Sequence, residues 1–158
     1  MRVTDTITAR NIPIIDYVPL QVRADREIQE ADYYSIRKED RSFLELTFDQ
    51  ADHTVCRITL VICSCYHKIN ANYNVPTDFI RGDVLIESAG EVDTPCFDCF
   101  IYQNAVKIVV SDSSADACIS SGNIIWELTS QGNLVSISVI DTTGQVSMHC
   151  ENELRTSE

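Results

Sequence analysis

Hydrophobic and polar residues alternate with a period of two along much of the chain, which is the pattern of half-buried β-strands. The clearest case is residues 124–139, where this alternation continues on both sides of a turn signal at Gln131-Gly132. A two-residue loop at this turn predicts a β-hairpin whose apolar residues share one face. The expected cross-strand pairs are Leu128–Val135, Trp126–Ile137 and Ile124–Val139.

Two further hairpins follow from the same pattern. Residues 44–62 alternate around a polar turn at 49–53, and residues 97–110 alternate around Gln103-Asn104. In the first hairpin the apolar face stays intact if the pairs are Phe48–Thr54, Leu46–Cys56 and Leu44–Ile58. In the second hairpin the expected pairs are Ile101–Val106, Cys99–Ile108 and Phe97–Val110.

The ends of the chain show weaker signals. Residues 24–31 contain helix-forming residues without glycine, so they are the helix candidate. Residues 146–150 have the composition of a last strand, and the tail from about residue 151 is expected to fray. We therefore predict one mainly β domain over residues 1–158, an antiparallel meander that forms a sandwich or open barrel with one short helix near the N-terminus.

Charge is distributed unevenly along this chain, whose formal net charge is −12. Between Asp83 and Leu154, Lys107 is the only basic residue against eleven acids. This half lacks the basic footprint that binding to a phosphate backbone requires, so direct nucleic-acid binding is not expected. An acidic surface suits a basic protein partner instead. The predicted partner-binding residues are Asp83, Glu87, Glu91, Asp93, Asp98, Asp112 and Asp116.

Seven cysteines raise the question of metal or redox chemistry. Cys63 and Cys65 form a C-x-C motif, and Cys96 and Cys99 form a C-x-x-C motif, so four thiolates could hold zinc if the two pairs met. However, Cys63 and Cys65 lie within a strand pattern rather than on a glycine-bearing knuckle. We therefore expect free, buried cysteines, no metal and no cofactor.

No catalytic signature is present, so we do not expect an enzyme. Residues 112–116 have the D-x-S-x-D spacing of a calcium loop, but Ala117 stands where the loop needs glycine and Asn123 where it needs glutamate. The chain also has no apolar run of membrane-spanning length, and its first residues do not have the pattern of a signal peptide. These features predict a cytoplasmic protein without a membrane partner.

In its size, acidity and strand composition the chain resembles the small, β-rich bacterial immunity proteins that neutralise polymorphic toxins, including those of contact-dependent growth inhibition systems. The resemblance implies a tight one-to-one complex with a cognate toxin domain, a nuclease being the natural partner because its cleft is basic. It implies no catalysis by this chain. The alternative is a non-catalytic ligand- or zinc-binding β domain. An exposed edge strand could also pair two copies into a homodimer.

Overall fold

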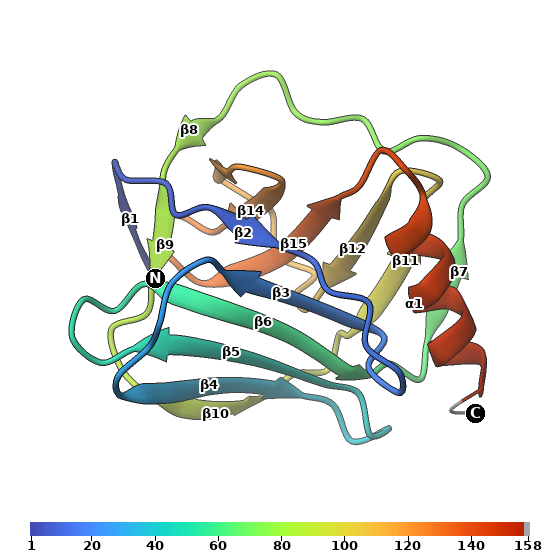
Figure 1. Cartoon of the computed structure of the whole chain (residues 1–158), viewed down its shortest axis with the longest axis horizontal. Coiled ribbons are helices and arrows are strands. Elements are labelled where there is room, and N and C mark those ends of the chain that lie inside the picture. Colours follow the sequence, from blue (N-terminus) through green and yellow to red (C-terminus); the bar gives the residue numbers. More distant parts are fainter. Residues whose placement is uncertain (157–158) are drawn as a thin grey trace.

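The computed structural model describes residues 1–156 and is mainly β (Figure 1). Within these residues the chain forms fifteen strands and one helix. The elements are β1 (Arg2–Thr4), β2 (Arg10–Asn11), β3 (Leu20–Ala24), β4 (Ala31–Arg37), β5 (Phe43–Asp49), β6 (Val55–Ile62), β7 (Tyr66–Lys68), β8 (Ile80–Arg81), β9 (Asp83–Leu85), β10 (Gly90–Asp93), β11 (Asp98–Ile101), β12 (Ala105–Val109), β13 (Ala117–Ser121), β14 (Ile124–Leu128), β15 (Leu134–Ile140) and α1 (Gln145–Thr156).

Two large sheets and one two-stranded sheet organise these strands. The six-stranded sheet has the order β10-β4-β5-β6-β3-β2, the seven-stranded sheet has the order β7-β11-β12-β15-β14-β13-β8, and β1 pairs with β9. Figure 1 shows β3, β6, β5 and β4 side by side in the lower half of the view, with β15, β12 and β11 in the upper half. The helix α1 lies beside β11 and β12.

One hydrophobic core takes side chains from both large sheets. Leu44, Leu46 and Leu60 enter it from the six-stranded sheet, and Trp126 and Ile137 enter it from the seven-stranded sheet. All five are almost completely buried. The alternation in the sequence therefore identified the face of each strand that turns inward, because successive side chains of a strand point to opposite faces.

The hairpin at residues 124–139 is confirmed, with one change of register. Trp126 pairs with Ile137 and Ile124 with Val139, as expected, but Leu128 pairs with Leu134 instead of Val135. The extra residue is Val135, which forms a β-bulge on β15 opposite the step from Glu127 to Leu128, and the loop closes through a hydrogen bond from the Thr129 amide to the Asn133 carbonyl. The loop is thus longer than the two residues expected, which the bulge permits without turning the apolar face outward.

The other two hairpins also form. At residues 97–110 the pairs Ile101–Val106 and Cys99–Ile108 are as expected. At residues 44–62 the register differs by two residues, since Leu46 pairs with Ile58 and Leu44 with Leu60. A shift of two preserves the inward face, so the alternation alone does not distinguish these registers.

The expected antiparallel meander is wrong, because β3 pairs with β6 instead of with β4 and β12 pairs with β15 instead of with β13, and because three short strands pair in parallel. Pairs β4–β10, β7–β11 and β8–β13 are parallel. Strands β7, β8 and β10 come from residues 66–93. Strands β7 and β8 form the two edges of the seven-stranded sheet, and β10 forms one edge of the six-stranded sheet. These strands have two to four residues each, too few for a period of two to reveal their partners.

The helix expected at residues 24–31 is not formed. Ala24 ends β3, Ala31 begins β4, and the residues between them form bends. Arg26 is held there by both oxygens of Asp52, so this segment is fixed by side-chain pairing rather than by helical hydrogen bonds. This segment connects β3 to β4, which belong to the same sheet with β5 and β6 between them.

The helix lies instead at the C-terminal end of the described residues, at Gln145–Thr156. The strand expected at 146–150 is therefore wrong, and so is the frayed tail expected from residue 151, as far as Thr156. Val146, Cys150 and Leu154 are buried at intervals of four residues, which places them on one helical face. Residues 157–158 lie outside the described part. No helix within residues 1–156 has the length and apolar content that a bilayer crossing requires.

Candidate functional site

Asp83, the first of the predicted partner-binding acids, is completely buried and cannot contribute to a contact surface. Its Oδ1 lies 2.9 Å from Arg10 Nη1, and its Oδ2 accepts hydrogen bonds from the amide and hydroxyl of Thr8. The carboxylate therefore joins the N-terminal segment to β9. Burial of a carboxylate is tolerated here because its charge is paired and its oxygens are hydrogen-bonded.

The other six acids lie along one side of the molecule, which we call the acidic side. Three of them mark one end of the seven-stranded sheet. Asp98 begins β11, while Asp112 follows β12 and Asp116 precedes β13. Because β11, β12, β15, β14 and β13 are successive antiparallel neighbours, the start of β11, the end of β12 and the start of β13 share this end. The acidic side comprises Glu87, Glu91, Asp93, Asp98, Asp112 and Asp116.

Residues 87–98 run along this same end and supply the remaining acids. Glu87 lines a small cavity together with Gly132 and Leu134, from the turn between β14 and β15. Further along, the hydroxyl of Thr94 donates a hydrogen bond to the Val110 carbonyl at 2.7 Å, beside the end of β12. Strand β10 lies between Glu87 and Thr94 in the sequence, and it is the edge strand that contains Glu91 and Asp93. All four of its residues are exposed.

Two arginines already contact part of the acidic side. Arg2 pairs with Glu87, and Arg37 pairs with Glu91 at 2.7 Å and with Asp93 at 3.0 Å. The hydrogen bond to Asp93 and the charge of Glu91 raise the pKa of Arg37 above its ordinary value. All of these side chains are about half exposed or more, so solvent screens the pairs and leaves them weak.

The other basic residues near this end are already paired, as Lys38, whose charge acts on Asp98, is bound to Asp40 at 3.6 Å. Asp112 has no ion pair within residues 1–156, and Asp116 accepts a hydrogen bond from the Ser130 amide at 2.7 Å. Lys107, the only basic residue between positions 83 and 154, is bound to Glu127 at 2.9 Å on β14. It is therefore not free to neutralise the loop that contains Asp112 and Asp116.

The four cysteines of the two motifs do not form a tetrathiolate site. Cys63 and Cys99 belong to the hydrophobic core, and the Cys63 thiol donates to the Cys65 carbonyl. Burial raises the pKa of Cys63 to about 12, so it remains a thiol at neutral pH. The hydrogen bond with Cys150 and complete burial raise the pKa of Cys99 as well. These two residues act as small hydrophobes.

Cys65 instead faces the side chains of His67 and Asp98. Their ligand atoms all lie within 4.8 Å of one another, with Cys65 Sγ 3.5 Å from His67 Nε2 and His67 Nε2 3.4 Å from Asp98 Oδ1. Cys65 and His67 share a face because they are two residues apart in extended chain, and Asp98 comes from β11, the parallel neighbour of β7. The sequence contained the C-x-H spacing at 65–67, but nothing in it placed residue 98 nearby.

This trio does not have the arrangement of a nucleophilic cysteine triad. In such a triad one imidazole nitrogen contacts the thiol and the other contacts the carboxylate. Here both contacts converge on the same atom, His67 Nε2. The hydrogen bond to Asp98 also raises the pKa of Cys65, whereas a nucleophilic cysteine requires a lowered pKa. Three donor atoms that converge are suited to a cation.

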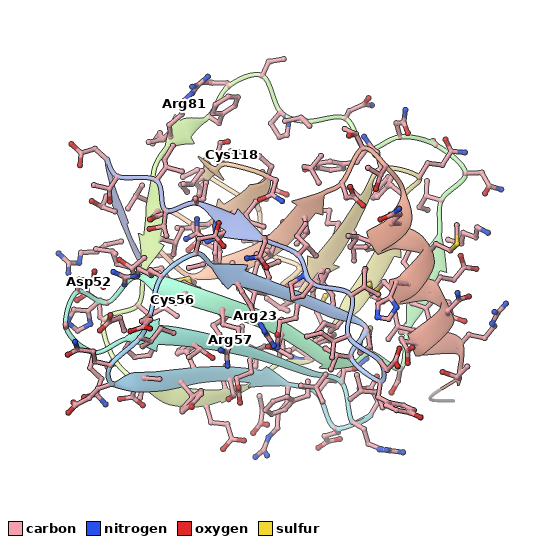
Figure 2. The ribbon with its side chains drawn as sticks, viewed as in Figure 1. Arg23, Asp52, Cys56, Arg57, Arg81 and Cys118 are labelled. Atoms are coloured by element: carbon pink, nitrogen blue, oxygen red, sulfur yellow. The ribbon has the colours of Figure 1, made fainter. Side chains whose placement is uncertain are left out.

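A second polar site lies on β3 and β6 of the six-stranded sheet. Arg23 on β3 and Arg57 on β6 are direct cross-strand partners, and Figure 2 shows their side chains next to each other over this sheet. Together with Arg26 and Cys56 they line a cavity of about 380 Å³. Within residues 1–156 the buried Nε of Arg57 and the buried Oγ1 of Thr47 have no hydrogen-bond partner. Like charges directly opposite each other repel, so an anion between them would stabilise the pair.

No protein-family model matches this chain, and no curated protein matches its sequence.

Proposed function

We propose that this chain is an immunity protein, which binds a cognate basic toxin domain and blocks it in a one-to-one complex. The observation that carries the proposal is the gathering of Glu87, Glu91, Asp93, Asp98, Asp112 and Asp116 on the acidic side, from segments as far apart as β10 and the loop before β13. These are six of the seven acids that the charge pattern selected. Asp83 has no part in the proposed contact.

Electrostatic complementarity explains why a nuclease would be the partner. A nuclease holds its phosphate substrate with arginines and lysines, and carboxylates can accept the same bidentate hydrogen bonds. Attraction between opposite charges also accelerates encounter, which benefits a protein that must act before the toxin reaches nucleic acid. The exposed pairs of Arg2 and Arg37 are weak enough to rearrange when a partner's arginines arrive.

The proposal assigns the large sheets a scaffold role. In it the two sheets form a sandwich around their shared core, and the edge strand β10 and the loop at 111–116 present the contact groups. The chain itself performs no catalysis and acts in the cytoplasm, where a toxin that has entered would meet it. Pairing of two copies through an exposed edge strand such as β10 is compatible with this role if the acidic side stays open.

A neighbouring gene for a large secreted protein with a basic C-terminal domain would supply the partner for a binding measurement that tests the proposal. The chain is immobilised and association and dissociation rates are followed at low and at physiological salt. We expect a one-to-one complex whose association slows as salt rises. Absence of binding at micromolar concentration and low salt would show that the immunity proposal is wrong.

A charge-matched pair of variants separates surface recognition from stability. Asp93→Lys with Asp112→Lys alters two exposed positions of the acidic side, and we expect association at low salt to slow by about tenfold or more. Glu27→Lys with Glu30→Lys makes the same change in net charge at exposed bends between β3 and β4. If the two double variants behave alike, net charge rather than the acidic side governs binding.

The alternative, a ligand-binding β domain, is supported by the cavity at Arg23 and Arg57. The expected occupant is a small anion, because Arg23 and Arg57 are cross-strand partners beside the cavity and Arg57 Nε has no hydrogen-bond partner within residues 1–156. Titration with inorganic phosphate would show saturable binding that Arg57→Met removes. Unsaturable or variant-independent binding would exclude this alternative.

A further inference from the structure

The donor atoms of Cys65, His67 and Asp98 are spaced as the corners of a metal coordination polyhedron. Zinc lies about 2.3 Å from a thiolate sulfur and about 2.0–2.2 Å from imidazole nitrogen or carboxylate oxygen. In a tetrahedron these bond lengths place neighbouring ligand atoms about 3.3–3.6 Å apart. Two of the three observed separations match, with 3.5 Å from Cys65 Sγ to His67 Nε2 and 3.4 Å from His67 Nε2 to Asp98 Oδ1, and the third, from Cys65 to Asp98, is within 4.8 Å.

The backbone holds these three residues in place without a ligand. Strands β7 and β11 are parallel neighbours, and the Cys99 amide donates to the Cys65 carbonyl at 3.1 Å. His67 stacks on Phe100, its cross-strand partner, with ring centroids 4.9 Å apart and planes 21° from parallel. The imidazole is therefore oriented by a neighbouring ring, so little rearrangement is needed to bring its Nε2 onto a cation.

We propose that Cys65, His67 and Asp98 form a Zn²⁺-binding site at the edge of the seven-stranded sheet. The mixed set of sulfur, nitrogen and oxygen donors suits zinc, whereas Mg²⁺ and Ca²⁺ prefer oxygen ligands alone. A thiolate and a carboxylate together balance the charge of the divalent ion. Zinc takes the place of the thiol proton of Cys65, which passes to solvent, and no electron is transferred.

The site is partly open to solvent, which leaves room for a further ligand. His67 and Asp98 have side chains 45% and 32% exposed. Cys96 approaches Asp98 Oδ2 at 3.9 Å but does not belong to the group of mutually close donors. The fourth tetrahedral position is therefore assigned to water, as in zinc sites that keep three protein ligands.

This site is independent of the proposed toxin binding, although Asp98 belongs to both. Zinc binding needs only the three side chains at the sheet edge, while partner binding draws on acids spread along residues 87–116. Failure of one proposal therefore does not decide the other. Absence of toxin binding would leave the zinc titration unaffected, and absence of zinc binding would leave all six surface acids available to a partner.

The test is a metal titration of the full chain, purified without a histidine tag and stripped with a chelator. Zn²⁺ is added in competition with a chromophoric chelator, and Co²⁺ serves as a spectroscopic probe. We expect one equivalent of zinc per chain. With Co²⁺ we expect the charge-transfer absorption of a thiolate–cobalt bond together with tetrahedral d–d bands.

Single substitutions assign the ligands. Cys65→Ser, His67→Ala and Asp98→Asn are each expected to weaken zinc binding at least about 100-fold, since removal of even an outer-sphere partner weakens a site by about 10–100-fold. The control is Cys118→Ser on β13, a partly exposed cysteine that lies outside the trio. Far-ultraviolet circular dichroism confirms that each variant folds, which is expected because the three side chains lie at the surface.

Three results would overturn the proposal. The first is absence of stoichiometric zinc at micromolar protein. The second is cobalt binding without the thiolate absorption. The third is binding that persists at full affinity in folded His67→Ala and Asp98→Asn.

Discussion

Arg10 Nη1 lies 2.9 Å from Asp83 Oδ1, and the two side chains are only 3% and 0% exposed. The pair is completed by Thr8, which donates two hydrogen bonds to Asp83, and by the Val55 carbonyl, which accepts one from Arg10. It connects the N-terminal segment, β9 and the start of β6. Asp83, which the sequence analysis assigned to a charged surface, therefore forms a buried ion pair that connects three segments of the fold.

Removal of Asp83 alone is expected to destabilise the protein strongly. Asp83→Leu leaves the buried Arg10 guanidinium without its counter-ion, and breaking a buried pair in this way costs about 3–5 kcal/mol. The free energy of unfolding, measured by urea denaturation, checks the value. The double variant Arg10→Met/Asp83→Leu should be more stable than Asp83→Leu, because no charge remains buried.

An exposed ion pair provides the control for that experiment. Glu87→Gln removes the partner of Arg2, and both side chains are more than half exposed. The expected loss is below about 1 kcal/mol. If Asp83→Leu lowers the free energy of unfolding no more than Glu87→Gln does, the buried pair does not stabilise the fold as its geometry indicates.

Leu154 anchors the C-terminal helix to the core. Its side chain is completely buried on α1, so Leu154→Ala should lower the free energy of unfolding by about 2–5 kcal/mol. Met148 on the same helix is 65% exposed, and Met148→Ala should change the free energy of unfolding by about 0.5 kcal/mol or less. Equal effects of the two substitutions would support the frayed tail expected from the sequence instead of a docked helix.

Asp141 caps the helix α1. Its Oδ2 accepts a hydrogen bond from the Val146 amide at 3.0 Å, in the first turn, and its Oδ1 accepts one from the Thr143 amide. Asp141→Ala should therefore cost about 1 kcal/mol, the usual value of a lost N-terminal cap. Thermal unfolding followed by circular dichroism provides the measurement. Asp112→Ala, in an exposed loop, is the control and should leave the midpoint unchanged.

Asp52 should make the protein less stable as the pH falls. The hydrogen bond from Arg26 lowers the pKa of Asp52 from 3.8 to about 2 in the folded state. Below pH 3.8 the unfolded chain takes up a proton that the folded chain refuses until about pH 2, so stability is lost across this interval. Because Asp52 is half exposed, its share is below about 1 kcal/mol.

Urea denaturation at several pH values isolates this contribution. Asp52→Asn cannot titrate, so the variant should lose less stability than the wild type between about pH 4 and pH 2. Other carboxylates titrate in both proteins, and the difference between the two curves removes their effect. Parallel curves for wild type and variant would show that the ion pair with Arg26 does not contribute.

The long hairpins were predictable from the sequence because each has two strands of four or more alternating residues joined by a short turn. Trp126 opposite Ile137 and Cys99 opposite Ile108 are examples of pairs read correctly from the pattern. The two-residue shift at Leu46 was not predictable, since both registers bury the same face. The helical signal at Val146, Cys150 and Leu154 was present at intervals of four but was obscured by the strand-like composition of residues 146–150.

The sites depended on tertiary structure to a much greater extent. The charge pattern selected seven acids, yet the sequence could not show that Asp83 is buried against Arg10 or that the other six share one side. The cysteine motifs suggested a pairing of thiols, whereas the fold buried Cys63 and Cys99 and left Cys65 beside a histidine and an aspartate.

By itself the sequence determined the mainly β class, the inward face of each long strand and the excess of acid in the second half. These are properties of single residues and of neighbours along one strand, so local periodicity and composition contain them. Only the tertiary structure decided which strands lie at the edges, where β7 meets β11 and which acids remain in solvent. Those outcomes depend on contacts between residues far apart in the chain, such as His67 with Asp98, and pairing of that kind leaves no trace in the local pattern.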